Sequence, residues 1–169
     1  MTTDSKVDLT LRVASAEEGE ALGDLGFAAW EASAFAENDA GRADRAKLRR
    51  SFRDFCSGKS ETILVAVSAD GPLGWGAREN GDHTISDLWV APFAQGQGVG
   101  AALLAALEAV IALDGFSEAE LETLAANAGA VRFYLRNGYE PVWRGRKFSA
   151  DLDYELDKIR FRKSLAAAA

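Results

Sequence analysis

Residues 86–104, SDLWVAPFAQGQGVGAALL, combine an apolar run, three alternating glycines at 96, 98 and 100, and a run with helical periodicity. A strand that ends in a glycine-rich turn and opens a helix leaves several backbone N–H groups unpaired and convergent. The helix dipole adds partial positive charge there, and glycine lets the backbone approach an anion with no Cβ between them. We therefore predict that this loop holds a phosphate and is more than a structural turn.

Two familiar phosphate loops match this stretch only in part. A Walker loop ends in Gly-Lys-Ser/Thr, and GVGAA lacks that ending. The dinucleotide fingerprint is matched in spacing by Gly96, Gly98 and Ala101, with Glu120 or Glu122 about twenty residues further on. However, PFAQ separates the strand from the first glycine, and the preceding strands form hairpins rather than βαβ repeats. A nicotinamide-dependent oxidoreductase is therefore a distant alternative.

The remaining sequence alternates between strand and helix patterns. Period-two apolar patterns and turn signals predict strands over 7–14, 61–68, 73–79, 83–91, 119–124, 139–146 and 152–162. Helical spacing predicts helices from 15 to about 34 and over 39–57, 98–113 and 127–137. Ser15 and Glu18 form a capping box, Asn127 is an N-cap, and Gly138 follows the last helix. This order predicts a mixed sheet with helices on both faces.

Length and composition limit the class of protein. The chain has 169 residues, of which 48% are hydrophobic, so we expect one domain over 1–165 and a frayed tail over 166–169. No apolar run reaches the length of a membrane span, and the N-terminus lacks the pattern of a signal peptide. The single cysteine, Cys56, excludes an internal disulfide, and we expect a cytoplasmic protein without a membrane partner.

Charge and ligand chemistry exclude further classes. The formal net charge of −7 argues against nucleic acid as a partner and is compatible with an amine-bearing substrate. One histidine and one cysteine exclude a His/Cys zinc cluster, and we expect no metal site. A pair of Cys56 and His83 is arithmetically possible, but no motif supports it.

Two motifs together resemble the GNAT acetyltransferase superfamily. QGQGVG resembles its acyl-CoA pyrophosphate loop, Arg/Gln-x-x-Gly-x-Gly/Ala, and LWVAP resembles the strand before that loop. NAGAVRFYLRNGY resembles the second signature of the family, Asn-x-x-Ala-x-x-Phe-Tyr-x-x-x-Gly-Phe/Tyr. The resemblance covers roughly residues 60–146 and implies the acyl-CoA N-acyltransferase fold. That fold is α/β, with one mixed, mostly antiparallel central sheet of about seven strands flanked by about four helices. The matching residues are Gln95, Gly98, Gly100, Asn127, Ala130, Phe133, Tyr134, Gly138 and Tyr139.

The resemblance implies acetyl-CoA as the cosubstrate and assigns residues to it. The pyrophosphate would bind the backbone of residues 96–101, and residues 88–90 would pair with the pantetheine arm like an added strand. A backbone N–H near Val90 would polarise the thioester carbonyl. Arg132 or Arg136 could supply charge for the rest of the nucleotide, although a solvent-facing helix arginine is the commoner reading for each of them. The implied donor-binding set is Leu88, Trp89, Val90, Gln95, Gly96, Gln97, Gly98, Val99, Gly100, Ala101, Asn127, Ala130, Phe133, Tyr134 and Arg136.

The general acid is assigned from the family resemblance, and the general base from its position in the sequence. Spacing alone favours a packed core tyrosine at 134, but the resemblance makes the Tyr134 phenol the general acid for the leaving thiolate. Asp87, one residue before LWV, is the candidate general base. Glu79, His83 and an ordered water are the alternatives for that role.

The acceptor is less defined by the sequence. The stripe Arg42, Arg45, Arg49 and Arg53 could bind an acceptor carboxylate or phosphates, although a solvated helix face is the commoner reading. Four tryptophans are expected mostly in the core, with Trp89 nearest to the reaction centre. With the family resemblance, we predict acetyl transfer to a primary amine of a small molecule. We expect the transfer to be direct, in a ternary complex, because no nucleophile for an acyl-enzyme intermediate is recognisable. Alternatives are a protein or peptide acceptor and a non-catalytic acyl-CoA-binding module. The resemblance also makes a homodimer possible.

Overall fold

The computed structural model of the chain describes residues 7–39 and 41–167. These residues form eight strands, five α-helices and three short 3-10 turns. The strands are β1 (Thr10–Val13), β2 (Ile63–Ser68), β3 (Gly71–Ala77), β4 (Thr84–Ile85), β5 (Asp87–Val90), β6 (Glu118–Leu124), β7 (Glu140–Ser149) and β8 (Tyr154–Ser164). The helices are α1 (Gly19–Glu31), α2 (Ala34–Asp39), α3 (Arg45–Gly58), α4 (Val99–Leu113) and α5 (Ala128–Arg136).

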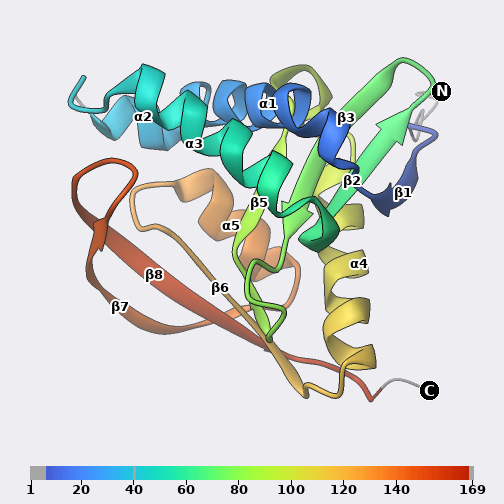
Figure 1. Ribbon diagram of the computed structural model, residues 1–169. Helices are drawn as coiled ribbons and strands as arrows, with labels where there is room; N and C mark the ends of the chain where they lie inside the picture. Colours follow the sequence, from blue (N-terminus) through green and yellow to red (C-terminus); the bar gives the residue numbers. More distant parts are fainter. Residues whose placement is uncertain (1–6, 40, 168–169) are drawn as a thin grey trace, which may run out of the picture.

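The strands form two four-stranded sheets, in the orders β1-β2-β3-β5 and β4-β6-β8-β7. Every pairing is antiparallel except that of β4 with β6. Helices α1 and α3 cover one face, through a core that includes Leu22, Val65 and Trp75 (Figure 1). Helices α4 and α5 cover the opposite face, where Leu107 and Tyr134 are buried. The arrangement confirms the expected α/β class with a mixed, mostly antiparallel pairing of strands.

The strand expected over 83–91 is divided at Ser86, which raises the strand count from seven to eight. The backbone N–H of Ser86 donates to the carbonyl of Ala77 at 2.9 Å, and Ala77 is also the register partner of Asp87. Two residues of one strand therefore face one residue of β3, which is the pattern of a β-bulge and bends the strand. Before the bulge, β4 pairs with β6; after it, β5 pairs with β3. The bulge thus separates β5 from β6 and divides the expected single sheet in two.

The first helical region differs from the expected pair of long helices. The capping pair is present, since the Glu18 carboxylate accepts the backbone N–H of Ser15 at 2.9 Å, but a 3-10 turn precedes α1. Helix α1 ends at Glu31, and the short α2 follows it because the Ser33 hydroxyl accepts the backbone N–H of Phe35 at 3.2 Å. Helix α3 begins only at Arg45, capped by Asp44. The expected helix over 39–57 is therefore shorter at its start.

The two chain ends are only partly described. Regular structure begins at Thr10 rather than at residue 7. Residues 168–169 of the tail predicted over 166–169 lie outside the described residues, so that prediction is untested. Within residues 7–39 and 41–167, every helix is too short or too polar to span a bilayer.

Helices α1 and α3 lie in close contact because glycines face the partner helix. A Cβ at position 23 would lie 2.5 Å from the Cα of Arg53, and one at position 19 would overlap Ser57. The Asp24 carboxylate on α1 accepts hydrogen bonds from both Arg49 and Arg53 of α3, at 2.7–3.0 Å. Two arginines of the exposed stripe are therefore engaged in ion pairs with α1.

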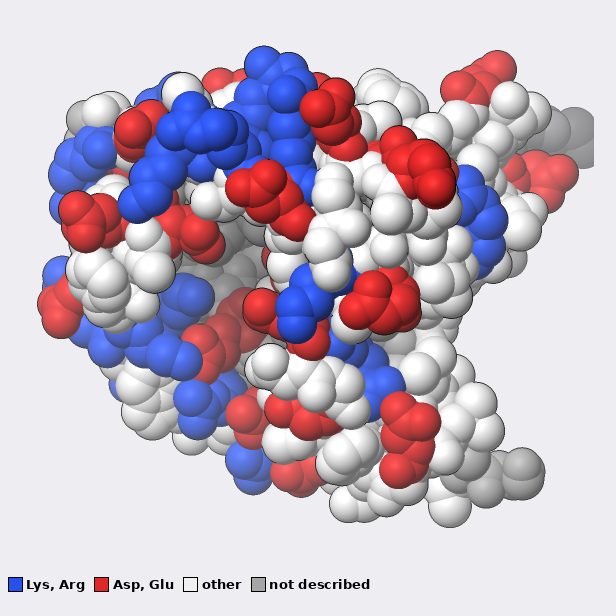
Figure 2. All heavy atoms as spheres, viewed as in Figure 1, with Lys and Arg blue, Asp and Glu red and all other residues white. Residues whose placement is uncertain are grey.

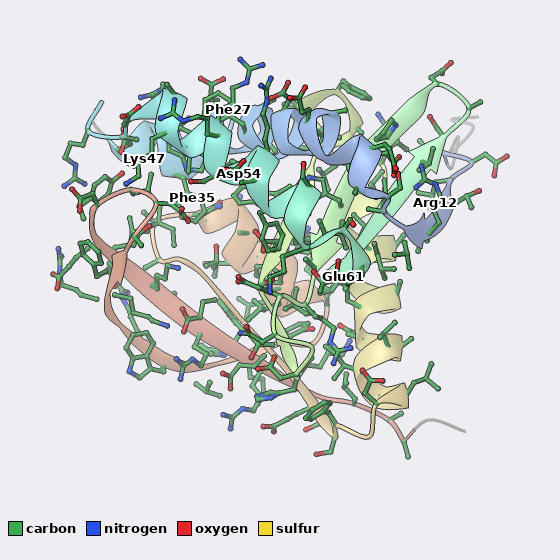
Figure 3. The ribbon with its side chains drawn as sticks, in the orientation of Figure 1. Arg12, Phe27, Phe35, Lys47, Asp54 and Glu61 are labelled. Atoms are coloured by element: carbon green, nitrogen blue, oxygen red, sulfur yellow. The ribbon has the colours of Figure 1, made fainter. Side chains whose placement is uncertain are left out.

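The tip of the β7–β8 hairpin is joined to α2 and α3. The buried Asp39 carboxylate accepts a hydrogen bond from the Tyr154 hydroxyl, and the Arg42 guanidinium lies 3.9 Å from the centre of the Tyr154 ring. The Lys47 ammonium donates to the carbonyl of Ala150 at 3.3 Å. Figure 3 shows Lys47 and Phe35 at the end of the helical layer that faces this hairpin. We call this set of contacts the hairpin latch.

Candidate active site

The glycine loop has the backbone conformation that its sequence suggests. Gly96 and Gly98 have φ of +74° and +84°, values that L side chains rarely adopt, and a Cβ at either position would meet no atom within 4 Å. Gly98 is the N-cap of α4, so the N–H groups of the first helical turn have no intrahelical partner. That turn contains no acidic residue. The third glycine, Gly100, lies inside α4, where a Cβ would contact the Phe133 ring at 3.4 Å. The loop and helix thus fit an anion such as a pyrophosphate.

A cavity of about 590 Å³, here the donor cavity, opens beside this loop between β5, α4 and α5. Every residue of the implied donor-binding set lines it except Gln97, whose side chain donates to the Phe93 carbonyl at 3.1 Å. Arg136 also lines the cavity, whereas Arg132 does not. Arg136 is therefore the better placed of the two arginines for a ligand phosphate.

The free edge of β5 forms one wall of the donor cavity. Ala91 donates its N–H to the Leu73 carbonyl at 2.8 Å, and backbone groups alternate sides along a strand. The N–H groups of Leu88 and Val90 therefore point away from β3, toward the side where β6 has diverged. On the β3 side, a Cβ at position 74 would lie 2.7 Å from the Trp89 carbonyl oxygen. Glycine at that position lets the two strands pair closely.

Helix α5 brings Asn127 and Tyr134 to the same cavity. The Asn127 side chain caps the helix by accepting the Ala130 N–H at 3.2 Å. Tyr134 is 9% exposed, and its ring packs against those of Phe133, Tyr139 and Phe161. Burial, and secondarily the negative charge of Asp87, raise the pKa of the Tyr134 phenol well above its ordinary value. Among the described residues its hydroxyl has no hydrogen-bond partner, so it is free to donate to a ligand.

A second cavity of about 500 Å³, here the acceptor cavity, lies on the other side of this junction. One wall consists of aromatic side chains from the helical layer, and the other consists of polar residues from β6 and β8. Figure 2 shows the hollow between the helices and the β7–β8 hairpin, with Lys, Arg, Asp and Glu side chains on its rim. Leu88, Trp89, Asn127, Ala130 and Tyr134 line both cavities, together with Ser33. The two cavities therefore meet at β5 and Tyr134.

The candidates for a base are distributed differently around these cavities. Asp87 and Glu79 line the acceptor cavity, whereas His83 lines neither cavity and instead packs against Phe116, with the ring centroids 5.9 Å apart. Burial raises the pKa of Asp87, a hydrogen bond from the Trp89 indole N–H opposes that change, and the negative charge of Glu79 adds to it. A carboxyl with a raised pKa close to a cavity is better suited to accept a proton at neutral pH than an ordinary aspartate.

The lining of the acceptor cavity also includes polar residues that the sequence did not place at the site, among them Glu122, Thr123, Asp151 and Lys158. Strand β6 carries glutamates at 118, 120 and 122, and β8 carries basic residues at 158, 160 and 162, a pattern that predicts only a polar face. Which charge faces the cavity depends on the β6–β8 register, in which Leu124 is opposite Lys158.

The remaining sequence candidates lie away from both cavities. Cys56 is fully buried in the core between α3 and the sheet, and burial raises the pKa of its thiol to about 12. It lines neither cavity, so it forms no catalytic pair with His83. Of the tryptophans, Trp30 and Trp75 are buried as expected, but Trp143 is 39% exposed on β7. In residues 7–39 and 41–167, no group of three or more His, Cys, Asp or Glu side chains could hold a metal ion.

Comparison with known proteins agrees with this geometry. The family model described as the acetyltransferase (GNAT) family matches residues 26–139. That range includes the glycine loop, β5, α4 and α5. Comparison with curated proteins gives no significant match.

Many solved structures have the same fold, and three of them are described here. The chain is similar to apo YjaB from Escherichia coli, with a TM-score of 0.72 and 23% identity over 95% of this chain and 100% of that one. It is similar to the PaiA N-acetyltransferase from Thermoplasma acidophilum in complex with coenzyme A, with a TM-score of 0.68 and 17% identity over 94% and 99%. It is also similar to the ribosomal-protein-S18-alanine N-acetyltransferase from Escherichia coli, with a TM-score of 0.65 and 19% identity over 96% and 97%. At these identities the likeness establishes the fold alone.

Proposed function

Because this chain belongs to the GNAT acetyltransferase family, we propose that it transfers an acetyl group from acetyl-CoA to a primary amine of a small molecule. The observation that carries the proposal is the meeting of two cavities at Leu88, Trp89 and Tyr134. A donor held in one cavity and an amine held in the other come into contact there. Both substrates are then bound together, and transfer is direct.

The residues of the donor cavity fit acetyl-CoA. The N–H groups at the start of α4 and in the glycine loop bind the pyrophosphate, and Arg136 adds positive charge. The free edge of β5 binds the amide groups of the pantetheine arm as an adjacent strand would. The Val90 N–H then points to the thioester carbonyl and stabilises negative charge on its oxygen. When bound, acetyl-CoA supplies an activated acyl group.

Asp87 and Tyr134 carry the two proton transfers. Asp87 accepts a proton from the amine as the amine nitrogen forms its bond to the acyl carbon. Tyr134 donates its phenol proton to the sulfur as the carbon–sulfur bond breaks. The charge of Asp87 is one cause of the raised pKa of Tyr134, so protonation of Asp87 makes Tyr134 a stronger acid during the same step. Proton uptake by Asp87 therefore favours the proton donation by Tyr134 that follows it.

The acceptor cavity supports a small molecule rather than a protein chain. A protein acceptor requires an open groove, but the hairpin latch joins the two walls of this cavity through Asp39, Tyr154 and Lys47. The proposal includes a cytoplasmic location, which the single buried Cys56 supports. A homodimer stays a prediction from the family resemblance.

The test is an acetyl-CoA-dependent thiol-release screen against amino acids, polyamines, aminoglycosides and peptides. Release with a small amine and not with peptides supports the proposal. Tight binding of CoA with no release for any amine contradicts it and favours the non-catalytic acyl-CoA-binding module.

A further inference from the structure

One cation in the acceptor cavity has no partner within the described part of the chain. Lys158, on β8, is half-buried and lines the cavity. No hydrogen bond or ion pair is found for its ammonium group among residues 7–39 and 41–167. By contrast, Lys147 and Lys163 each bind a carboxylate, at 3.0 Å and 2.9 Å. An ammonium that is partly removed from water and left unpaired is costly unless a ligand supplies the counter-charge.

The carboxylate on the same wall, Glu122, is already paired with other cations. Glu122 accepts hydrogen bonds from Lys147 at 3.0 Å and from Arg160 at 2.8 Å. Burial lowers the pKa of Lys158, while the negative charges of Glu122 and Asp87 oppose that change. Of these charged residues only Glu122 and Lys158 line the cavity, and Lys147 and Arg160 balance the charge of Glu122 from behind the lining. Lys158 is therefore the positive group of this wall that is left for a ligand.

The other inward charge is Asp87, and it has the opposite sign. Asp87 lies at the junction with the donor cavity, next to Trp89. The two further carboxylates of the cavity, Glu79 and Asp151, are exposed and so lie at its mouth. The inner part of the cavity therefore offers one negative and one positive group to the same ligand.

The third feature of the cavity is its aromatic wall. Trp89 packs against Phe52 and Phe35, with ring centroids 5.2 Å and 6.3 Å apart, and Trp30 lies further along the same wall. Flat apolar surfaces of this kind bind an apolar or aromatic group.

We infer that the acceptor is an amino acid with a bulky apolar or aromatic side chain, whose carboxylate binds Lys158 and whose α-amino group faces Asp87. This inference rests on the proposed acetyl transfer. The α-amino nitrogen forms the new amide bond, its proton passes to Asp87, and CoA leaves as the thiol. The carboxylate remains bound to Lys158 and takes no part in the bond changes.

Matched pairs of amines test the role of the carboxylate. The pairs are L-phenylalanine with phenethylamine and L-tryptophan with tryptamine, measured by thiol release from acetyl-CoA. Lys158→Met is expected to lower kcat/KM for the amino acids about 10- to 100-fold, mainly through KM, which is the usual effect of losing a charge-assisted hydrogen bond. The same variant should change kcat/KM for the decarboxylated amines by less than about threefold. Lys158→Arg should retain much of the preference for the amino acids.

Lys147→Met is the matched control. It removes one positive charge from the neighbouring strand β7, where Lys147 binds Glu122 and does not line the cavity. Its preference for amino acids over decarboxylated amines should equal that of the wild type. A wild-type enzyme that prefers the decarboxylated amines, or a Lys158→Met variant that loses both classes equally, overturns the inference.

A binding measurement separates this inference from the proposed function. Titration of L-phenylalanine, which has no indole fluorescence, into the protein with CoA should change the tryptophan fluorescence, because Trp30 and Trp89 both line the cavity. If binding depends on Lys158 while no amine is acetylated, the acetyl-transfer proposal fails and the amino-acid site stands. If the protein acetylates amines but Lys158→Met binds L-phenylalanine as tightly as the wild type does, the amino-acid site fails.

Discussion

Replacement of Tyr134 by phenylalanine separates catalysis from folding in this structure. The change removes one oxygen and keeps the ring, which packs against Phe133, Tyr139 and Phe161 with centroids 5.2–5.9 Å apart. Because no described residue bonds to the hydroxyl, its loss should alter the free energy of unfolding by less than about 1 kcal/mol. For a chain of this size that corresponds to a change in Tm of at most about 4 °C.

The effect of Tyr134→Phe on turnover should be much larger. A positioned general acid contributes about 10²- to 10⁴-fold to the rate, so kcat should fall by that factor. The donor cavity keeps its other lining groups, and the affinity for CoA should stay within about twofold of the wild type. Since burial raises the pKa of Tyr134, its phenol stays protonated to about pH 10 or higher, and wild-type activity should show no loss from its ionisation below that pH.

Tyr139→Phe is a matched control from the same aromatic cluster. The Tyr139 hydroxyl donates to Glu108 at 3.0 Å, and Tyr139 lines neither cavity. Loss of a hydrogen bond to a carboxylate costs about 1.5–3 kcal/mol, so this variant should melt about 3–12 °C lower and keep its kcat. Thermal melts, CoA titration and steady-state thiol release on both variants are the assays. A Tyr134→Phe enzyme with kcat within about threefold of the wild type at every pH would refute the assignment of the acid.

Three further variants test the base, the strand spacing and the N-terminal cap. Asp87→Asn should lower kcat at least about 100-fold and abolish the rise of kcat/KM with pH. Because the folded-state pKa of Asp87 is raised, its charge costs stability above that pKa, so the same variant should melt higher at pH 8; a lower Tm would contradict this. Gly74→Ala places a Cβ 2.7 Å from the Trp89 carbonyl oxygen, so it should lower the free energy of unfolding by about 1–3 kcal/mol and weaken CoA binding. The control is Gly58→Ala, whose Cβ would meet no atom within 4 Å and which should leave the Tm unchanged or raise it. Hydrogen bonding from Arg12 lowers the pKa of Glu18 to about 2, so Glu18→Gln should lower Tm at pH 7 and have little effect near pH 2; equal losses at both pH values would contradict that reasoning.

The backbone of the glycine loop and of the two helices beside it could be predicted from the sequence because its signals are local. Two glycines with positive φ, a helix start and a capped second helix each depend on a few neighbouring residues. The same holds for the helices over 98–113 and 127–137, whose observed bounds differ from the predicted ones by at most one residue. Local backbone preferences and tertiary structure agree there, so pattern and fold coincide.

The division of the sheet at Ser86 could not be predicted in this way. Residues 83–91 have one continuous strand pattern, and the bulge exists because Ala77 on another strand faces both Ser86 and Asp87. The start of α3 was placed too early for a similar reason. Asp39 accepts the Ala43 N–H at 3.0 Å and a hydrogen bond from Tyr154, a residue far along the chain.

The acceptor cavity depends almost entirely on long-range register. Lys158 and Asp87 are 71 positions apart in the sequence, as their numbers give, and no spacing rule connects them. Both residues face one cavity for two reasons. Strand β8 pairs with β6, and the hairpin latch holds the tip of the β7–β8 hairpin against α3. Alternating charges along the two strands indicate only a polar face, and the assembled fold selects the charge that faces inward.

The gap between β5 and β6 has a consequence for how the protein unfolds. Within residues 7–39 and 41–167, β5 and β6 are not paired with each other, and α4 packs against strands of both half-sheets. A ligand that forms backbone hydrogen bonds with β5 would therefore connect the two half-sheets, which otherwise unfold as partly independent units. We expect amide hydrogen exchange at Leu88 and Val90 to slow when CoA is present, and thermal unfolding to become sharper as the halves are coupled. Part of the free energy that holds the two half-sheets together would thus come from the bound CoA and not from the chain itself.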